Sequence, residues 1–284
     1  MRKSFTRTGV DRWQSADTVA RVVPERWSER DAYEAYMGRW SRRVAPLFLR
    51  WLTAPAGRRW VDVGCGTGAL SGAILAAAAP ADLVGVDSSA AFVTAAADRV
   101  GDPRARFRVG DAMALPLPDG EADLAVSGLA LNFVPEPRRA VAELARVTTP
   151  GGTVAAYVWD YGDGMEMLRH FWAAAAKIDP AAPDELDRFA AVCRPDPLRT
   201  LWTGAGLEGV TVDAVSTPTT FTGFDDFWTP FLGGQGPAPG FVASLEPTDR
   251  NRLRDLLRSR LPAAPDGSIR LTARAWTVRG TVPG

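Results

Sequence analysis

The chain has 284 residues, with 33 basic and 33 acidic side chains. Its zero formal net charge excludes an overall field that would draw it onto a nucleic acid or a membrane surface. We therefore expect neither of these partners, and we expect a monomer or a homodimer. The length suits a single α/β domain with insertions.

Two cysteines, Cys65 and Cys193, are too few for a multi-bridge disulfide framework, and we expect both to be free thiols. Residues 1–23 mix charged and polar side chains without an apolar segment, so they lack the features of a secretory signal. The longest apolar run, residues 73–79, is much shorter than the ~20 residues that cross a bilayer. We therefore predict a cytoplasmic protein in which residues 1–24 form a mobile N-terminal arm.

The first half of the chain carries a repeated strand and helix pattern. Apolar and aromatic residues at three- and four-residue steps first predict an amphipathic helix over residues 30–52, which Pro46 could divide in two. Short β-like runs, each ending at a Gly or Asp, then alternate with alanine-rich helical stretches. The predicted strands are 60–63, 82–86, 105–109, 122–127 and 153–159, and the helices between them are 68–79, 89–100 and 136–147. This alternation predicts a parallel sheet with helices on both faces.

After residue 159 the alternation stops. The pattern then predicts helices over residues 165–178, 197–205 and 250–261, and strands over residues 210–215 and 269–278. Residues 217–240 are rich in glycine, proline and aromatic side chains. We expect one domain over residues 25–284, in which residues 160–195 and 217–262 are insertions that cap the active site.

A glycine-rich turn follows the first predicted strand, with Gly64, Gly66 and Gly68 just before a helix. Glycine lets the backbone approach a ligand that any Cβ would block. Gly64, Gly66 and Ala69 also fit the G-x-G-x-x-G/A spacing of dinucleotide-binding folds. The turn alone is therefore also compatible with a nicotinamide cofactor, or with a turn that only connects the strand to the helix.

Two acidic residues end the next two predicted strands. Asp87 lies about 20 residues beyond the glycine turn, where a carboxylate can accept hydrogen bonds from both ribose hydroxyls of an adenosine. Asp111 ends the third strand at the same edge of the sheet, where it could accept a hydrogen bond from the adenine amino group. Either aspartate could instead cap the helix that follows it, since Asp is a favoured N-cap residue.

These features together resemble a known family. Residues 61–68, 84–87, 110–112, 122–133 and 146–152 are similar, in order and spacing, to the signature segments of class I S-adenosylmethionine-dependent methyltransferases. The similarity spans roughly residues 36–159 and is greatest to the bacterial small-molecule group called type 11. It implies S-adenosylmethionine as the cofactor and S-adenosylhomocysteine as its product.

The resemblance also implies the fold. We expect a doubly wound, mostly parallel, seven-stranded Rossmann-like α/β sheet, with an N-terminal helical cover and a C-terminal lid insertion. Strand 269–278 should run antiparallel, beside strand 210–215. The motif from Tyr36 to Ser41 resembles the helix that covers the cofactor in this group.

The resemblance further assigns roles to individual residues. It implies that Asp62 organises the amino end of the methionine moiety, that Asp87 holds the ribose, and that Arg39 neutralises the cofactor carboxylate. Arg39 and Trp40 could equally be ordinary helix surface and core. The expected cofactor-binding residues are Tyr36, Arg39, Trp40, Asp62, Gly64, Cys65, Gly66, Asp87, Ser88, Asp111, Ala112, Met113, Ser127, Gly128 and Asn132.

Methyl transfer from a sulfonium is a direct displacement, so the protein mainly aligns the acceptor and excludes water. We predict no metal, because His170 is the only histidine and the two cysteines lie far apart, although scattered carboxylates leave an oxygen-rich metal site open. Some acceptors would need a proton acceptor near the end of strand 153–159. The candidates are Asp160, Tyr161 and His170, although a helical histidine beside aromatic residues more often packs or lies at the surface.

The methyl acceptor is expected to be a small, partly apolar molecule. Residues 224–240 combine apolar anchors with Gly233, Gly234, Gly236 and Gly240, which predicts a mobile lid; the alternative is an irregular surface loop. The expected acceptor-binding residues are Phe133, Trp159, Phe227, Trp228 and Phe231.

Three other functions stay open beside methyl transfer. The glycine spacing alone permits an NAD-linked oxidoreductase. A protein of the same fold could bind the cofactor in a regulatory role without turnover, since fold does not determine function. It could also use the cofactor's positive charge for another reaction, such as a cyclisation.

Overall fold

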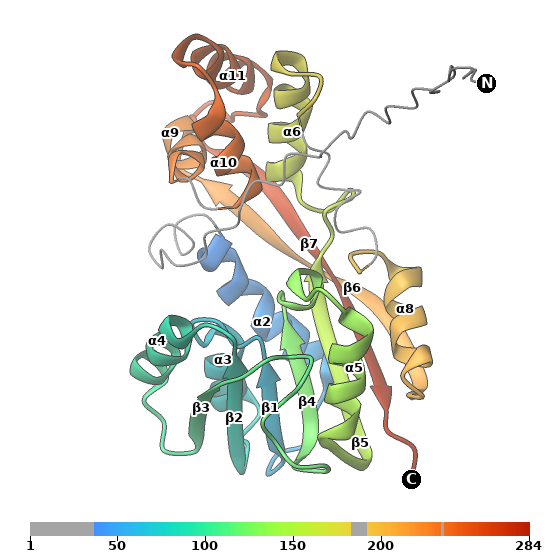
Figure 1. Cartoon of the computed structure of the whole chain (residues 1–284). Coiled ribbons are helices and arrows are strands. Elements are labelled where there is room, and N and C mark those ends of the chain that lie inside the picture. Colours follow the sequence, from blue (N-terminus) through green and yellow to red (C-terminus); the bar gives the residue numbers. More distant parts are fainter. Residues whose placement is uncertain (1–36, 183–191, 234–235) are drawn as a thin grey trace, which may run out of the picture.

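The computed structural model describes residues 37–182, 192–233 and 236–284. The predicted N-terminal arm, residues 1–24, lies outside this range. Figure 1 shows a twisted sheet flanked by helices and, beyond one end of it, a group of helices that we call the cap. The cap consists of α6 Glu166–Ile178, α9 Phe224–Trp228, η3 Thr229–Leu232, α10 Pro237–Ser244 and α11 Pro247–Arg260.

The sheet has seven strands in the order β3-β2-β1-β4-β5-β7-β6. The strands are β1 Arg59–Val63, β2 Asp82–Asp87, β3 Ala105–Val109, β4 Ala122–Gly128, β5 Thr148–Trp159, β6 Glu208–Phe221 and β7 Ile269–Thr281. β7 lies between β5 and β6 and runs antiparallel to both, whereas β1 to β5 pair in parallel. The predicted sheet and the predicted place of its last strand are confirmed.

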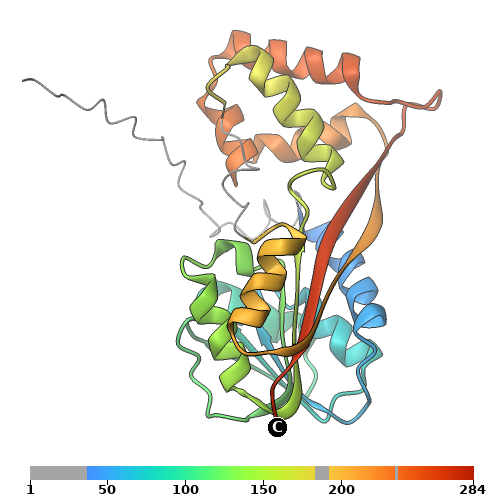
Figure 2. The ribbon, with the colours of Figure 1, turned by 90° about the vertical axis from the view of Figure 1, so that its right-hand side faces the viewer.

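Helices cover both faces of the sheet (Figure 2). On one face lie α2 Arg39–Leu52 and α3 Ala69–Ala77, with α4 Ala90–Val100 against β2 and β3. On the other face lie α5 Pro137–Arg146 and α8 Pro195–Gly204. The alternating side chains of β1 enter two apolar cores, Trp60 in the core beside α2 and Val61 in the core beside α5. Such burial on both faces explains why the parallel strands are nearly continuous apolar runs.

Pro46 lies inside α2 and does not divide it, so the predicted division is wrong. Proline removes one backbone hydrogen bond from a helix interior. Its neighbours Val44, Ala45 and Phe48 are fully buried against the sheet, and this packing holds the helix together across the proline.

The cap is built on the far ends of β6 and β7, which extend beyond the rest of the sheet (Figure 1). An aromatic cluster forms its centre, in which the rings of Phe171 and Phe231 stack with centroids 4.6 Å apart. α6 follows the carboxyl end of β5, so the cap lies on the side of the sheet where the parallel strands end.

Candidate functional site

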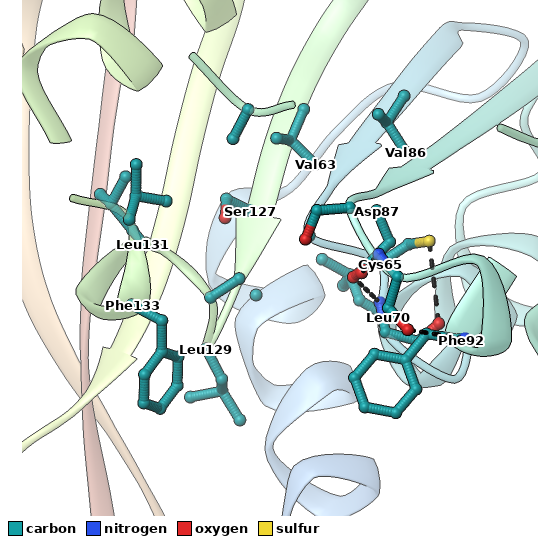
Figure 3. Close-up of a pocket in the computed structure, with 18 of the residues that line it drawn as sticks. Val63, Cys65, Leu70, Val86, Asp87, Phe92, Ser127, Leu129, Leu131 and Phe133 are labelled. Atoms are coloured by element: carbon teal, nitrogen blue, oxygen red, sulfur yellow. Dashed lines mark hydrogen bonds between the residues drawn. The ribbon is translucent and has the colours of Figure 1, made fainter. Parts of the chain in front are cut away.

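A cavity of about 310 Å³ lies at the carboxyl ends of the parallel strands. The turns after β1, β2, β3 and β4 line it, together with Gly38 and Ser41 of the N-terminal helical segment. Figure 3 shows Asp87, Cys65 and Phe92 on one side and Leu129, Leu131 and Phe133 on the other. The volume is within the range of roughly 300–1,000 Å³ that is typical of small-molecule sites.

The glycine turn forms the floor of the cavity. Gly64, Gly66 and Gly68 have φ values of 72°, 53° and 83°, in the left-handed region that favours glycine. A Cβ on Gly64 would lie 2.3 Å from the Cβ of Ala130, which follows β4. Glycine is therefore required here on two grounds, backbone conformation and the close approach of a neighbouring segment.

Asp87, at the end of β2, lines the cavity and braces the turn. Its two carboxylate oxygens accept hydrogen bonds from the backbone N–H groups of Gly66 and Ser89, each at 2.9 Å. The N-cap of α4 is Ser89, whose hydroxyl oxygen accepts from the N–H of Phe92 at 3.3 Å. Asp87 is therefore not the cap of this helix, and its carboxylate faces the turn and the cavity.

The end of β3 brings Asp111 and Ala112 into the same cavity, and Ser88 lines it beside Asp87. The Asp111 carboxylate accepts a hydrogen bond from the N–H of Met113 at 2.8 Å. Met113 itself does not line the cavity. Asp111 precedes a tight turn and no helix, so it is not a helix cap either.

Asp62 lies behind the turn and is completely buried. One carboxylate oxygen accepts a hydrogen bond from the Ser71 hydroxyl at 2.6 Å, and the other has no partner among the described residues. Burial raises the pKa of this carboxyl to about 7. Burial also raises the pKa of the Cys65 thiol, which lines the cavity and is therefore held in its unreactive protonated form.

The opposite side of the cavity is formed by the segment after β4. Ser127, Gly128 and Phe133 line it, as the sequence predicts, but Asn132 and Trp159 do not. The side-chain nitrogen of Asn132 is buried without a partner among the described residues, and Trp159 belongs to the core beside α2.

Sequence reasoning missed several lining residues. Phe92, Leu129, Leu131, Val134 and Tyr157 all border the cavity. Tyr157 carried a signal, because it is the one polar side chain in the apolar run from Val154 to Trp159. The sequence gives no indication that Leu129 lines the cavity, because its left-handed φ of 59° is a property of the folded chain alone.

Arg39 and Trp40 lie at the start of α2 but outside the cavity lining. The Arg39 guanidinium forms an ion pair with Asp226 of α9 at 2.8 Å and lies over the rings of Trp40 and Phe221. Trp40 is buried, with its ring 5.4 Å from that of Phe221. Tyr36 lies outside the described residues.

The three candidate proton acceptors do not line the cavity. Asp160 is buried and accepts hydrogen bonds from Arg274 Nε at 2.7 Å and from the N–H of Gly162 at 3.1 Å, so its carboxylate holds the chain together where it leaves β5. Tyr161 packs against both apolar cores. His170 lies on α6 in the cap, where partial burial lowers its pKa.

The predicted acceptor-binding residues Phe227, Trp228 and Phe231 are buried in the aromatic centre of the cap and do not line the cavity. Within the predicted lid, residues 224–240, the described residues 224–232 and 237–240 lie in short helices. Gly234 of the predicted hinge lies outside the described residues, so the lid stays a prediction.

Within the described part of the chain, no three histidine, cysteine or acidic side chains gather in a position that could hold a metal ion. No helix in that part is long and apolar enough to span a membrane.

Comparison with known proteins relates part of this chain to a family. Residues 61–156 match the family described as "Methyltransferase domain". A 2-methyl-6-phytyl-1,4-hydroquinone methyltransferase from Synechocystis is 32% identical over 182 residues, which cover 56% of this chain and 57% of that protein. The chain spans between 33% and 59% of the length of the first curated relatives that it matches.

Two solved structures share the fold. One is phosphoethanolamine N-methyltransferase 2 of Haemonchus contortus in complex with S-adenosyl-L-methionine, with a TM-score of 0.55 at 17% sequence identity. The match covers 89% of this chain and 56% of the other chain. The other is the [4+2]-cyclase SpnF, with a TM-score of 0.53 at 22% sequence identity. This match covers 86% of this chain and 81% of the cyclase chain.

The strand order and the cavity at the carboxyl edge of the sheet are those of the class I, Rossmann-like methyltransferase fold. More particularly, residues 61–156 are an S-adenosylmethionine-dependent methyltransferase domain of the type 11 group.

The buried carboxyl of Asp62 predicts a pH-dependent stability. Its pKa is about 7 in the folded protein and 3.8 is its ordinary value, so between these pH values the folded state binds more protons than the unfolded state. Raising the pH from about 4 to about 7 should therefore lower the free energy of unfolding, by up to roughly 4 kcal/mol, relative to an Asp62→Asn variant. Urea unfolding of both proteins across this range measures the effect, and parallel pH profiles would contradict it.

The contacts of Asp160 predict a structural role. Asp160→Asn weakens the bond to Arg274 and should lower the free energy of unfolding by about 1–3 kcal/mol, with cofactor affinity unchanged. Asp163→Asn, an exposed neighbour, is the control and should leave stability unchanged. A variant of Asp160 that kept full stability but lost turnover would instead identify a proton acceptor.

Proposed function

We propose that this chain transfers the methyl group of S-adenosylmethionine to a small, partly apolar acceptor. The observation that carries the proposal is one cavity, within a methyltransferase domain, that joins Asp87 and Asp111 at one end to Ser127 and Gly128 at the other across the glycine turn. An extended nucleoside joined to an amino acid matches this distribution of polar groups.

The residues present fit this cofactor. Gly66 lines the cavity, and no atom lies within 4 Å of the position that a Cβ would take there, so the backbone can lie directly beneath a ligand. The Asp87 carboxylate can accept hydrogen bonds from ribose hydroxyls while it braces the turn, and Asp111 with Ala112 would frame the adenine. One oxygen of the Asp62 carboxyl, behind the turn, has no partner among the described residues and could accept a hydrogen bond from the amino end of the cofactor.

When bound, the cofactor supplies an activated methyl group on a positively charged sulfur. The residues of this chain would do the remaining work, which is to bind and orient the acceptor and to exclude water. No covalent attachment of either molecule to the chain is needed. Phe133, 37% exposed and in the cavity lining, would contact the acceptor where it enters.

The acceptor class is inferred from the cavity wall. Leu129, Leu131 and Phe133 form an apolar surface beside Ser127, which suits a molecule with an apolar body and a polar reacting atom. The relative from Synechocystis is named for a hydroquinone that carries a phytyl chain, a molecule of this kind. This similarity supports the acceptor class without identifying the acceptor.

A different reaction of the same fold is the second candidate, because a cyclase has this fold too. Incubation with S-adenosylmethionine labelled in its methyl group, together with fractions of small molecules from a host extract, separates the two. Methyl transfer gives a labelled product and equimolar S-adenosylhomocysteine. Conversion of a host compound without label would favour the second candidate, and preferential binding of NAD would contradict both.

Asp87 provides a prediction about cofactor affinity. Asp87→Ala should weaken S-adenosylmethionine binding by about 1.5–3 kcal/mol, because hydrogen bonds to a charged acceptor are lost. The matched control is Asp82→Ala at the opposite end of β2, where the carboxylate forms an exposed ion pair with Arg106. Titration calorimetry of both variants provides the measurement, and an unchanged affinity for Asp87→Ala would remove this residue from the site.

A further inference from the structure

The cavity extends across the ends of five strands, and its two ends differ. Asp111 after β3 and Asp87 after β2 lie at one end, and Ser127 of β4 and Tyr157 of β5 lie at the other. If the acidic end holds the adenosine, as proposed above, the reacting methyl lies toward β4 and β5. The inference below rests on that proposed function and concerns the residue that contacts the acceptor there.

Tyr157 is held firmly at this end. It is paired with Gly128 across β4 and β5, and its side chain is only 2% exposed. A Cβ on Gly128 would lie 2.7 Å from the Tyr157 hydroxyl oxygen and 2.9 Å from its ring, so the ring lies directly against the glycine. The ring also packs against Phe48, with centroids 4.7 Å apart. Packing against Gly128 and Phe48 fixes the position of the hydroxyl before any ligand binds.

The other polar side chains near this end are less suited to contact an acceptor. The Ser41 hydroxyl donates a hydrogen bond to the carbonyl oxygen of Met37, and the Ser127 hydroxyl lies one bond from its Cβ, so it reaches less far from the sheet than a tyrosine hydroxyl. Asp160 and His170 lie outside the cavity lining. Among the described lining residues contributed by β4, β5 and α2, Tyr157 carries the longest polar side chain.

We propose that the Tyr157 hydroxyl oxygen accepts a hydrogen bond from the O–H or N–H group of the methyl acceptor and so directs its lone pair at the methyl carbon. The bond from the acceptor atom to the methyl carbon forms as the sulfur–carbon bond breaks. The electron pair of the broken bond goes to sulfur, which becomes a neutral thioether, and the proton of the acceptor passes to water. The acceptor class is therefore a hydroxyl or amino group on an apolar body.

The hydroxyl can be removed without disturbing the packing. Tyr157→Phe keeps the ring between Gly128 and Phe48 and deletes only the oxygen. The matched control is Thr277→Val, which removes another buried hydroxyl on β7, from the residue paired with Tyr157 in the sheet. Thr277 does not line the cavity, so its replacement should leave ligand binding unchanged.

Binding of three small probes to the protein saturated with S-adenosylhomocysteine tests the proposal. Phenol and aniline each carry a donor, and anisole has a similar body without one. We expect the wild type and Thr277→Val to bind phenol or aniline about tenfold more tightly than anisole, the scale of one hydrogen bond, and Tyr157→Phe to lose this preference. A preference that survives in Tyr157→Phe, or no measurable binding of any probe to the wild type, would overturn the proposal.

A kinetic readout complements binding once the labelled-methyl assay has identified an acceptor. Tyr157→Phe should lower kcat at least tenfold while the KM for S-adenosylmethionine stays within about twofold, because the hydroxyl acts on the acceptor. Failure of S-adenosylhomocysteine to bind the wild type would refute the proposed function itself. Normal binding of that molecule with an unchanged kcat in Tyr157→Phe would refute only the role of Tyr157.

Discussion

The whole site depends on how closely the turn after β1 approaches the segment after β4. β1 and β4 are parallel neighbours, so their carboxyl ends meet at one edge of the sheet. At that edge only a glycine at position 64 leaves room for Ala130, whose Cβ would lie 2.3 Å from an added Cβ. This approach turns two loops into a continuous floor, and it brings the polar groups of β2 and β3 within reach of the apolar wall after β4.

Two carboxylates, Asp87 and Asp111, give this edge of the sheet a preference for positive ligands. Asp62 adds little charge below pH 7, because burial and the nearby charge of Asp87 raise the pKa of its carboxyl to about 7. The Arg39 side chain, which could have balanced them, is paired with Asp226 of the cap. A cofactor that carries a sulfonium and an ammonium group would find an excess of negative charge here, and S-adenosylhomocysteine, which lacks the sulfonium charge, would benefit less from it.

A long-range ion pair joins the cap to α2, and another lies at the base of the cap. Arg39 and Asp226 connect the helix beside the cavity to α9. Asp160 and Arg274 connect the end of β5 to β7 at the base of the cap, and Gly164 fits against both side chains, where a Cβ would lie 2.6 Å from the Cβ of Arg274. The aromatic residues of the cap pack against one another within the apolar core that also contains residues of α2 and the sheet.

The sequence by itself determined the order of strands and helices through β5, the glycine turn, and the acidic residues at the ends of β2 and β3. These features are local: hydrophobic periodicity, backbone freedom at glycine and the position of a residue at a strand end can all be recognised within a few residues. Only the tertiary structure decided which side chains face the cavity. Arg39 pairs with a residue 187 positions away and Asp160 with one 114 positions away, so no local spacing could predict that both are committed elsewhere. Tyr157 reaches the cavity for the same reason, because its neighbours there come from β4 and α2, which only the folded sheet brings together.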